Sequence, residues 1–214
     1  MKPFSMSRTS MAVGLLFVSS VGFANVTGGV DPSYVRVKAY EIRVSPNADC
    51  SNAITVFRNA APSYLDMVNN PTLGSGAIPN GTYNCVMMRM SDQIHFTPST
   101  VNGAWAHGVC AVGTDGAADV GHDETAVDPD GTPHVLGNKG TEDILWLYIR
   151  TGVTNGQNNQ NAFAPTGGIP LLSPLVVHGD GTHTMVFDFS GAVGEEQDNG
   201  VWSCDCDAPT LSFR

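Results

Sequence analysis

The order of apolar and polar residues along the chain predicts strands. Residues 34–44 alternate apolar and polar side chains, which is typical of a half-buried strand. Residues 54–57 and 144–150 predict two further strands. Residues 82–90 place Val86, Met88 and Met90 on one face, and residues 91–96 continue the strand. We interpret the methionines as core filler, because their flexible side chains fill irregular gaps.

The last third of the chain predicts a hairpin and an edge strand. Residues 175–178 and 182–189 are apolar and flank a Gly-Asp-Gly turn. Residues 191–199 are interpreted as a polar loop, and residues 210–213 as an edge strand. Residues 64–68 fit a helix or a strand equally well. About eight strands and no long helix predict an all-β fold, an antiparallel β-sandwich.

Long segments rich in Gly, Asp and Asn separate these strands. The segment of about residues 97–143 is the longest, and from residue 111 onward it holds eight acidic residues against one cation, Lys139. We interpret it as one long acidic loop, and a loop of this length in a compact domain is usually functional or mobile. Residues 155–161 are low-complexity and polar, which predicts an exposed loop.

The first residues are typical of a secretory signal peptide. Lys2 and Arg8 precede an apolar run over residues 11–23, and Gly22 and Ala24 occupy the two positions that a signal peptidase reads. The run is shorter than the roughly 18 apolar residues that a membrane span needs. We therefore expect residues 1–24 to be a signal peptide and residues 25–214 to form a single β-sandwich domain. No cysteine stands at the new N-terminus, so a lipid anchor is not expected.

Charge narrows the classes of partner. All 20 acidic residues but only 8 of the 10 Lys and Arg follow residue 24, so the exported chain has a formal charge of −12. A negative charge of this size disfavours binding to nucleic acid or to anionic lipid. Charged residues make up only 14% of the chain, while Gly and Pro number 24 and 13, a balance that favours an exported all-β protein. We expect a periplasmic or extracellular protein with no transmembrane segment after cleavage.

Five cysteines, all after the cleavage site, predict disulfides in an oxidising compartment. They are Cys50, Cys85, Cys110, Cys204 and Cys206. One must stay unpaired within the chain, and the sequence leaves 15 pairing patterns open. Cys204 and Cys206 point the same way from one strand, so we expect each to pair elsewhere or one to be the free thiol. A redox site usually has two residues between its cysteines, not one.

Tyr83 stands two residues before Cys85 and follows a Pro-Asn-Gly turn, as in the tyrosine corner of an immunoglobulin-like domain. The resemblance to a true immunoglobulin domain, which would pair Cys85 with Cys50, fails on two counts. Residues 62–64 stand where that fold needs its core tryptophan, and the separation of the two cysteines is too short. We therefore interpret Tyr83 as a structural corner residue.

A second resemblance covers about residues 34–90. The long alternating strand, a short strand, Tyr-Leu-Asp-Met-Val at 64–68 and Gly-Ala-Ile-Pro-Asn-Gly-Thr-Tyr at 76–83 follow in this order. This layout resembles the secreted bacterial domains of unknown function called DUF4382. The resemblance implies a prealbumin-like β-sandwich with no known enzymatic activity. The lipoprotein cysteine that is usual in that family is missing from this chain.

The sequence contains two candidate metal sites. Asp128-Pro-Asp-Gly131 resembles part of a calcium loop, but Ala126 and Gly137 occupy ligand positions of the EF-hand, which excludes that motif. An irregular calcium site would use Asp123, Asp128 and Asp130. His178, Asp180 and His183 surround the hairpin turn but give too few converging ligands for zinc. We expect the side chains of both candidate sites to be solvated and the protein to bind no cofactor. The alternative is that the three aspartates bind calcium.

The chain lacks the sequence patterns of common catalysts. It has neither Gly-x-Ser-x-Gly nor a Gly-rich phosphate loop with Lys-Ser or Lys-Thr. We expect no enzyme but a non-catalytic binding or assembly module of the bacterial cell envelope, with an unidentified protein or envelope ligand as partner. The alternatives are a calcium-dependent adhesion or ligand-binding module and a hydrolase with an unrecognised site. A homo-oligomer could form through an edge strand or the unpaired cysteine.

Overall fold

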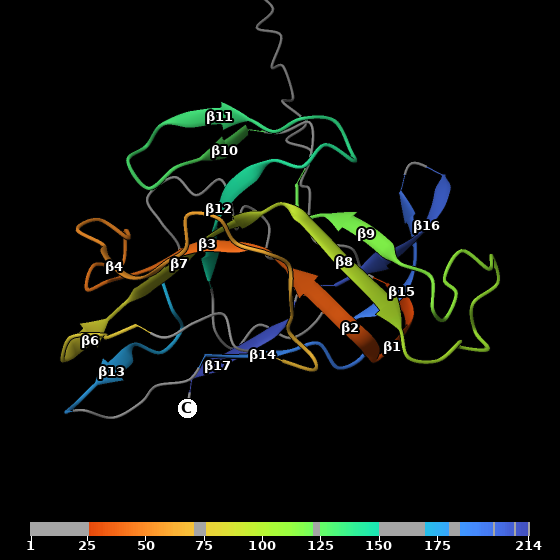
Figure 1. Cartoon of the computed structure of the whole chain (residues 1–214), viewed down its shortest axis with the longest axis horizontal. Helices are drawn as coiled ribbons and strands as arrows, with labels where there is room; N and C mark the ends of the chain where they lie inside the picture. Colours follow the sequence, from red (N-terminus) through yellow and green to blue (C-terminus); the bar gives the residue numbers. More distant parts are fainter. Residues whose placement is uncertain are drawn as a thin grey trace, which may run out of the picture.

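The described part of the chain is built from strands. The computed structural model describes residues 26–70, 76–121, 125–149, 170–179, 185–198, 200–207 and 209–213. These ranges contain no helix, and their antiparallel sheets pack against each other, which confirms the predicted all-β, sandwich-like fold (Figure 1). The strands are β1 (Thr27–Val30), β2 (Pro32–Val37), β3 (Ala39–Ser45), β4 (Ile54–Arg58), β5 (Leu65–Asp66), β6 (Gly81–Tyr83), β7 (Cys85–Ser91), β8 (Gln93–Pro98), β9 (Gly116–Asp119), β10 (Thr125–Val127), β11 (Pro133–Val135), β12 (Ile144–Ile149), β13 (Leu175–Val177), β14 (Met185–Asp188), β15 (Val193–Asp198), β16 (Val201–Cys206) and β17 (Thr210–Phe213).

Two four-stranded sheets form the centre of the molecule. The β7 sheet has the strand order β12-β7-β3-β4, and the β8 sheet has the order β5-β2-β8-β9. A three-stranded sheet, β1-β15-β16, and the pairs β10-β11, β13-β6 and β14-β17 complete the fold. The strands of each sheet pair antiparallel, as in a sandwich that can bury one face and expose the other.

The two central sheets share a pair of bent strands. Residues 34–44, predicted as one strand, are divided at Lys38 between β2 and β3, and β7 and β8 are divided at Asp92 in the same way (Figure 1). In the register, Arg36 faces His95 and Ala39 faces Met90, so three steps on one strand match five on the other. The two extra residues form a bulge, and a bulge bends a strand pair so that it passes from one sheet to the next.

Alternation along β7 fills the main core from one face and a second, smaller core from the other. Val86, Met88 and Met90 are buried in the main core with Val35 and Phe96, which confirms the methionines as core filler. On the opposite face, a second cluster consists of Cys50, Cys85, Met87, Trp146 and Tyr148. The β7 sheet is thus covered on both sides, and the second cluster anchors the loop that carries Cys50.

The predicted corner at Tyr83 is present. The Tyr83 hydroxyl donates a hydrogen bond to the backbone carbonyl of Pro79, 2.8 Å away and four residues upstream. In one uninterrupted strand Tyr83 and Cys85 would lie on the same face, but Tyr83 belongs to the main core and Cys85 to the second cluster. The reason is that the strand is interrupted at Asn84, which separates β6 from β7.

Three predictions about loops and pairing were wrong. The acidic segment 97–143 is not one loop, because it contains β9, β10 and β11. Residues 191–199 were predicted as a polar loop, but residues 193–198 form β15, which pairs with β16. The described parts of the predicted hairpin do not pair with each other either: β13 pairs with β6, and β14 pairs with β17. Its turn and residues 155–161 lie outside the described residues.

Candidate functional site

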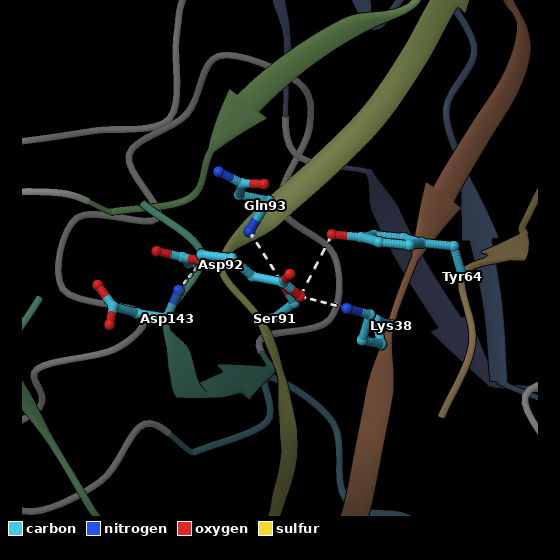
Figure 2. Close-up of polar contacts among 7 residues, drawn as sticks. Lys38, Tyr64, Ser91, Asp92, Gln93 and Asp143 are labelled. Atoms are coloured by element: carbon cyan, nitrogen blue, oxygen red, sulfur yellow. Dashed lines mark hydrogen bonds and ion pairs between the residues drawn. The ribbon is translucent and has the colours of Figure 1, made fainter. Parts of the chain in front are cut away.

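The corner between the two central sheets is held by Asp92 (Figure 2). The backbone N–H of Asp92 donates to the carbonyl of Asp143 at 3.0 Å, and its carboxylate accepts the N–H of Asp143 at 2.7 Å. Its own carbonyl accepts the N–H of Val120 at 2.8 Å. Burial, and to a smaller extent the neighbouring carboxylates of Asp119 and Asp143, raise the pKa of Asp92 to about 6. Asp92 therefore joins the bend to the segments before β12 and after β9.

Beside this corner, three side chains contact the same carboxylate oxygen of Glu142. Ser91 donates its hydroxyl to Glu142 Oε1 at 2.9 Å, the Tyr64 hydroxyl lies 3.4 Å from the same atom, and Lys38 forms an ion pair with it. Figure 2 shows Lys38, Tyr64 and Ser91 converging from three different strands or connections. The hydrogen bond from Lys38 lowers the pKa of Glu142, and the same bond raises the pKa of Lys38.

The contacts continue from Lys38 across the outward face of the β8 sheet. The Lys38 ammonium lies 4.5 Å from the centre of the Tyr64 ring, which meets the His95 ring edge-on at 4.7 Å. His95 Nδ1 lies 3.1 Å from Asp115 Oδ2, and Tyr34 donates its hydroxyl to Asp115 Oδ1.

The last member of this series is Arg36, whose guanidinium stacks 4.0 Å over the Tyr34 ring. We call the continuous set the outer cluster, and it comprises Tyr34, Arg36, Lys38, Tyr64, His95, Asp115 and Glu142.

Charges within the outer cluster are balanced locally. Partial burial opposes ionisation of Asp115, but the hydrogen bonds from Tyr34 and His95 outweigh it and lower the pKa of this carboxyl. Burial and the bond to Asp115 raise the pKa of Tyr34 to about 12, and burial raises the pKa of Tyr64. Both phenols are therefore neutral donors at neutral pH, and Asp115 and Glu142 are ionised acceptors.

Three amine and hydroxyl groups at or beside the outer cluster are not activated as nucleophiles. A lysine that acts as a general base needs a lowered pKa, whereas that of Lys38 is raised. Ser91 is 0% exposed, so no substrate can reach its hydroxyl. The Tyr34 phenol, with a pKa of about 12, is a poor nucleophile. Rings, a guanidinium and carboxylates that are fixed in place can instead form contacts to a bound surface.

Four of the predicted cysteines form two disulfides. Cys50 pairs with Cys85, and Cys110 pairs with Cys204. Two disulfides are typical of an oxidising, exported environment. Cys206 is the free thiol at 4% exposure, and burial raises the pKa of this thiol well above its usual value. To link two molecules through this thiol, the end of β16 would first have to open.

The structure brings together only part of the predicted calcium site. Asp128 and Asp130 occupy the turn between β10 and β11, where Asp130 Oδ1 accepts the N–H of Thr132 at 2.9 Å. Asp128 Oδ1 lies 3.6 Å from His134 Nδ1. Asp123 falls outside the described residues, as do Asp180 and His183 of the second metal site drawn from the sequence. In the described ranges no three His, Cys, Asp or Glu side chains are placed to hold a metal ion. Calcium binding by the set of three aspartates stays a prediction.

Part of the outer cluster can be recognised in the sequence. Alternation along residues 34–44 assigns Tyr34, Arg36 and Lys38 to one face, opposite buried Val35 and Val37. Nothing in the sequence indicates their acidic partners, since Asp115 and Glu142 are 81 and 104 residues away from Tyr34 and Lys38. Both acids belong to the segment that was predicted to be an acidic loop, and a solvated carboxylate in a loop needs no partner.

Comparison of the chain with protein-family models, with curated proteins and with solved structures found no match. The resemblance of residues 34–90 to DUF4382 domains therefore stays a prediction. Within the described ranges, no helix is long and apolar enough to cross a membrane.

Proposed function

We propose that this protein is an exported, non-catalytic binding module of the bacterial cell envelope that contacts a partner protein through the outer cluster. Residues 1–24 direct export and are removed. The two disulfides support an oxidising destination. The resemblance to DUF4382 domains, which carry no known activity, agrees with a binding role.

The observation that carries the proposal is the arrangement of rings and charges on the outward face of the β8 sheet. Tyr and Arg are the residue types that most often dominate the binding energy of protein interfaces. Here Tyr34 and Tyr64 are fixed by hydrogen bonds and ring contacts before any partner arrives. A surface that is already ordered loses little side-chain entropy on association, which strengthens binding. Arg36 is exposed and presents its donors beyond the Tyr34 ring.

Site-specific photo-crosslinking in the producing cell tests this proposal. The crosslinking residue replaces Ala117, which is exposed and faces His95 across the β8–β9 ladder. Val135, exposed on β11, is the control position. We expect a discrete protein adduct from position 117 and none from position 135. The mass of the exported chain, measured in the same preparation, should correspond to a start at Asn25.

A matched pair of variants separates the outer cluster from general surface effects. Arg36→Ala removes the guanidinium over Tyr34 and should abolish the adduct. Arg89→Ala removes a comparable guanidinium, 5.8 Å from the Tyr40 ring on the β7 sheet, and should leave the adduct unchanged. Equal adducts from positions 117 and 135, or an Arg36→Ala variant that still forms the adduct, would contradict the proposal.

A further inference from the structure

Three arginines lie on the face of the β7 sheet that also carries the second cluster. Glu41 on β3 is opposite Arg58 on β4 and opposite Arg89 on β7, so these two arginines stand on either side of one carboxylate. Arg89 is also opposite Trp146 on β12, and the guanidinium of Arg43 stacks 4.5 Å from the centre of the Trp146 ring. We call Arg43, Arg58 and Arg89, with Glu41 between them, the arginine face.

Glu41 fixes two of these guanidinium groups in place. It is 4% exposed, and its Oε1 accepts hydrogen bonds from Arg43 Nε at 2.7 Å and from Arg58 Nη2 at 2.8 Å. Each of these bonds uses one of the five N–H donors of an arginine. Arg43 is half-buried and Arg58 is exposed, so their outer N–H groups face solvent. A ligand would find these donors already ordered, which lowers the entropy lost on binding.

The arginine face carries more positive than negative charge. Hydrogen bonds from Thr132 and, to a smaller extent, the charge of Arg43 lower the pKa of Asp130 in the β10–β11 turn, so this acid lies on the Arg43 side. Three guanidinium groups thus face two carboxylates. Arg89 is exposed, its guanidinium lies 5.8 Å from the centre of the Tyr40 ring, and none of the described carboxylates forms an ion pair with it. The positive charge that remains is therefore at the Arg58 and Arg89 side of the face.

We propose that the arginine face binds a soluble phosphate monoester, such as a sugar phosphate. A carboxylate has two oxygens and matches one guanidinium, whereas the phosphate of a monoester has three free oxygens and can accept N–H groups from two guanidiniums at once. Two strand spacings, about 10 Å, separate the backbones of Arg58 and Arg89, and Arg58 already reaches across to Glu41.

The charge of the whole chain selects between two sources of this phosphate group. The exported chain has a formal charge of −12, which opposes its approach to an anionic membrane surface but matters less for a small soluble ion. A soluble ligand is therefore favoured over a lipid headgroup. The inference is independent of the outer cluster, because the two sites share no residue.

The indole N–H signals of the tryptophans report binding and include two controls. The exported chain contains Trp105, Trp146 and Trp202. Trp105 donates its indole N–H to the carbonyl of Gly28, and Trp202 on β16 stacks on His107, so neither belongs to the β7 sheet. In the ¹⁵N-labelled exported protein at pH 7.5 and constant ionic strength, methyl phosphate should shift the Trp146 signal and leave the other two in place. Trp146→Phe assigns the signal.

Matched probes separate phosphate recognition from a general attraction of anions. Methyl phosphate is mostly a dianion at pH 7.5, because the second pKa of a phosphate monoester is about 6. Dimethyl phosphate carries one charge and lacks the third free oxygen. We expect dimethyl phosphate and acetate to bind at least about fivefold more weakly than methyl phosphate. Vesicles of phosphatidic acid present the monoester on a membrane, and we expect the protein not to sediment with them.

Variants without the charge locate the site. Arg58→Gln and Arg89→Gln should each weaken methyl phosphate binding about threefold, and the double variant about tenfold. Arg36→Gln removes the same charge from the outer cluster and should have no effect. Glu41→Gln makes the face more positive, which would strengthen simple attraction, but it loosens the hold on Arg43 and Arg58, so we expect weaker binding. The two exposed arginines on β4 and β7 decide the test if Glu41→Gln does not fold.

Four results would overturn the proposal. They are equal shifts of the Trp146 signal with methyl phosphate and dimethyl phosphate, no shift with methyl phosphate at millimolar concentration, tighter binding in a folded Glu41→Gln variant, and an equal loss of binding in Arg36→Gln and Arg89→Gln. Sedimentation with phosphatidic acid vesicles that Arg89→Gln abolishes would assign the site to a lipid headgroup and contradict a soluble ligand.

Discussion

At the residue scale, the chain buries the carboxylates of Glu195 and Glu41, and each of them accepts hydrogen bonds from three donors. Glu195 is 2% exposed and accepts three backbone N–H groups, from Ala106 at 3.0 Å, His107 at 3.2 Å and Val109 at 3.1 Å. A buried carboxylate is tolerated only when its oxygens are hydrogen-bonded. Because its donors belong to a segment almost 90 residues away, Glu195 fixes the connection between β8 and β9 onto β15.

Glu41 follows the same principle with side-chain donors. Its Oε1 accepts hydrogen bonds from Arg43 at 2.7 Å, Arg58 at 2.8 Å and Thr55 at 2.6 Å. Burial opposes ionisation, but these donors outweigh it and lower the pKa of Glu41 to about 2. Glu41 therefore stays ionised at every pH at which the protein is expected to work, and it ties the end of β4 to β3.

We predict that Glu195→Gln destabilises the protein by about 2–3 kcal/mol. The amide has one acceptor oxygen, so the N–H groups on one side of the side chain would face an NH₂ donor. Urea unfolding measures the loss, and hydrogen exchange of the amides of Ala106, His107 and Val109 should accelerate. Gln197→Ala, exposed on the same strand, is the control and should change stability by less than about 0.5 kcal/mol. Retained protection of the three amides in Glu195→Gln would contradict the assignment.

At the scale of elements, the disulfides tie connecting segments to strands. Cys50, which follows β3, is joined to the first residue of β7, and Cys110, which precedes β9, is joined to β16. The separations are 35 and 94 residues. A disulfide restricts the unfolded chain more strongly when the loop it closes is longer.

We therefore predict that removing Cys110–Cys204 costs more stability than removing Cys50–Cys85. Loop entropy gives about 4.7 kcal/mol for the first and about 4 kcal/mol for the second. The measurement compares urea unfolding of the double variants Cys110→Ala/Cys204→Ala and Cys50→Ala/Cys85→Ala. Cys206→Ala, which removes a buried sulfur but no bridge, is the control for lost packing and should cost about 1 kcal/mol. The opposite order would show that packing around Trp146 outweighs loop entropy.

At the scale of the whole molecule, folding raises the pKa of two carboxyl groups that lie next to the sheet junctions. Burial raises the pKa of Asp92 to about 6, and burial also raises the pKa of Asp207 to about 6. Asp207 follows β16, and its carboxylate lies 3.4 Å from the backbone nitrogen of Val26 at the start of the described chain. Both carboxyls bind a proton more readily in the folded than in the unfolded state, so folding is linked to proton uptake.

The sign of this linkage predicts a protein that is more stable in mild acid than at neutral pH. The contribution of a carboxyl with a raised pKa is full below its unfolded pKa and is lost as the pH rises through the folded value. Glu41 acts in the opposite direction below its unfolded pKa of 4.5. We expect a maximum near pH 4–5 and a loss of about 2 kcal/mol, or about 5 °C in melting temperature, between pH 5 and 7.5.

Asp92→Asn tests this directly. The amide oxygen can still accept the N–H of Asp143, but the group no longer ionises. We expect the melting temperature of this variant to fall by about half as much as that of the unaltered protein between pH 5 and 7.5. Asp130→Asn, exposed in the β10–β11 turn, should keep the full decrease. An unaltered protein whose melting temperature rises over this range would rule out the linkage.

The sequence by itself determined the fold class, the main core and one wall of the outer cluster. Alternation of period two is a local property, so Val35 and Val37 are buried and Tyr34 and Arg36 face outward as predicted. The Tyr83 corner could also be predicted, because its hydrogen bond spans only four residues. The need for disulfides followed from the number of cysteines and the charge and leader pattern of the chain.

Only the tertiary structure decided which segments meet. The residues 193–198 appear as a polar loop in sequence, because the buried Glu195 is indistinguishable from a solvated acid until its three N–H donors are seen. The choice of Cys110 over Cys206 as the partner of Cys204 and the pairing of Asp115 with Tyr34 have the same origin. Contacts over 80 or more residues depend on how the bent strand pairs place the sheets, and local patterns contain no information on that placement.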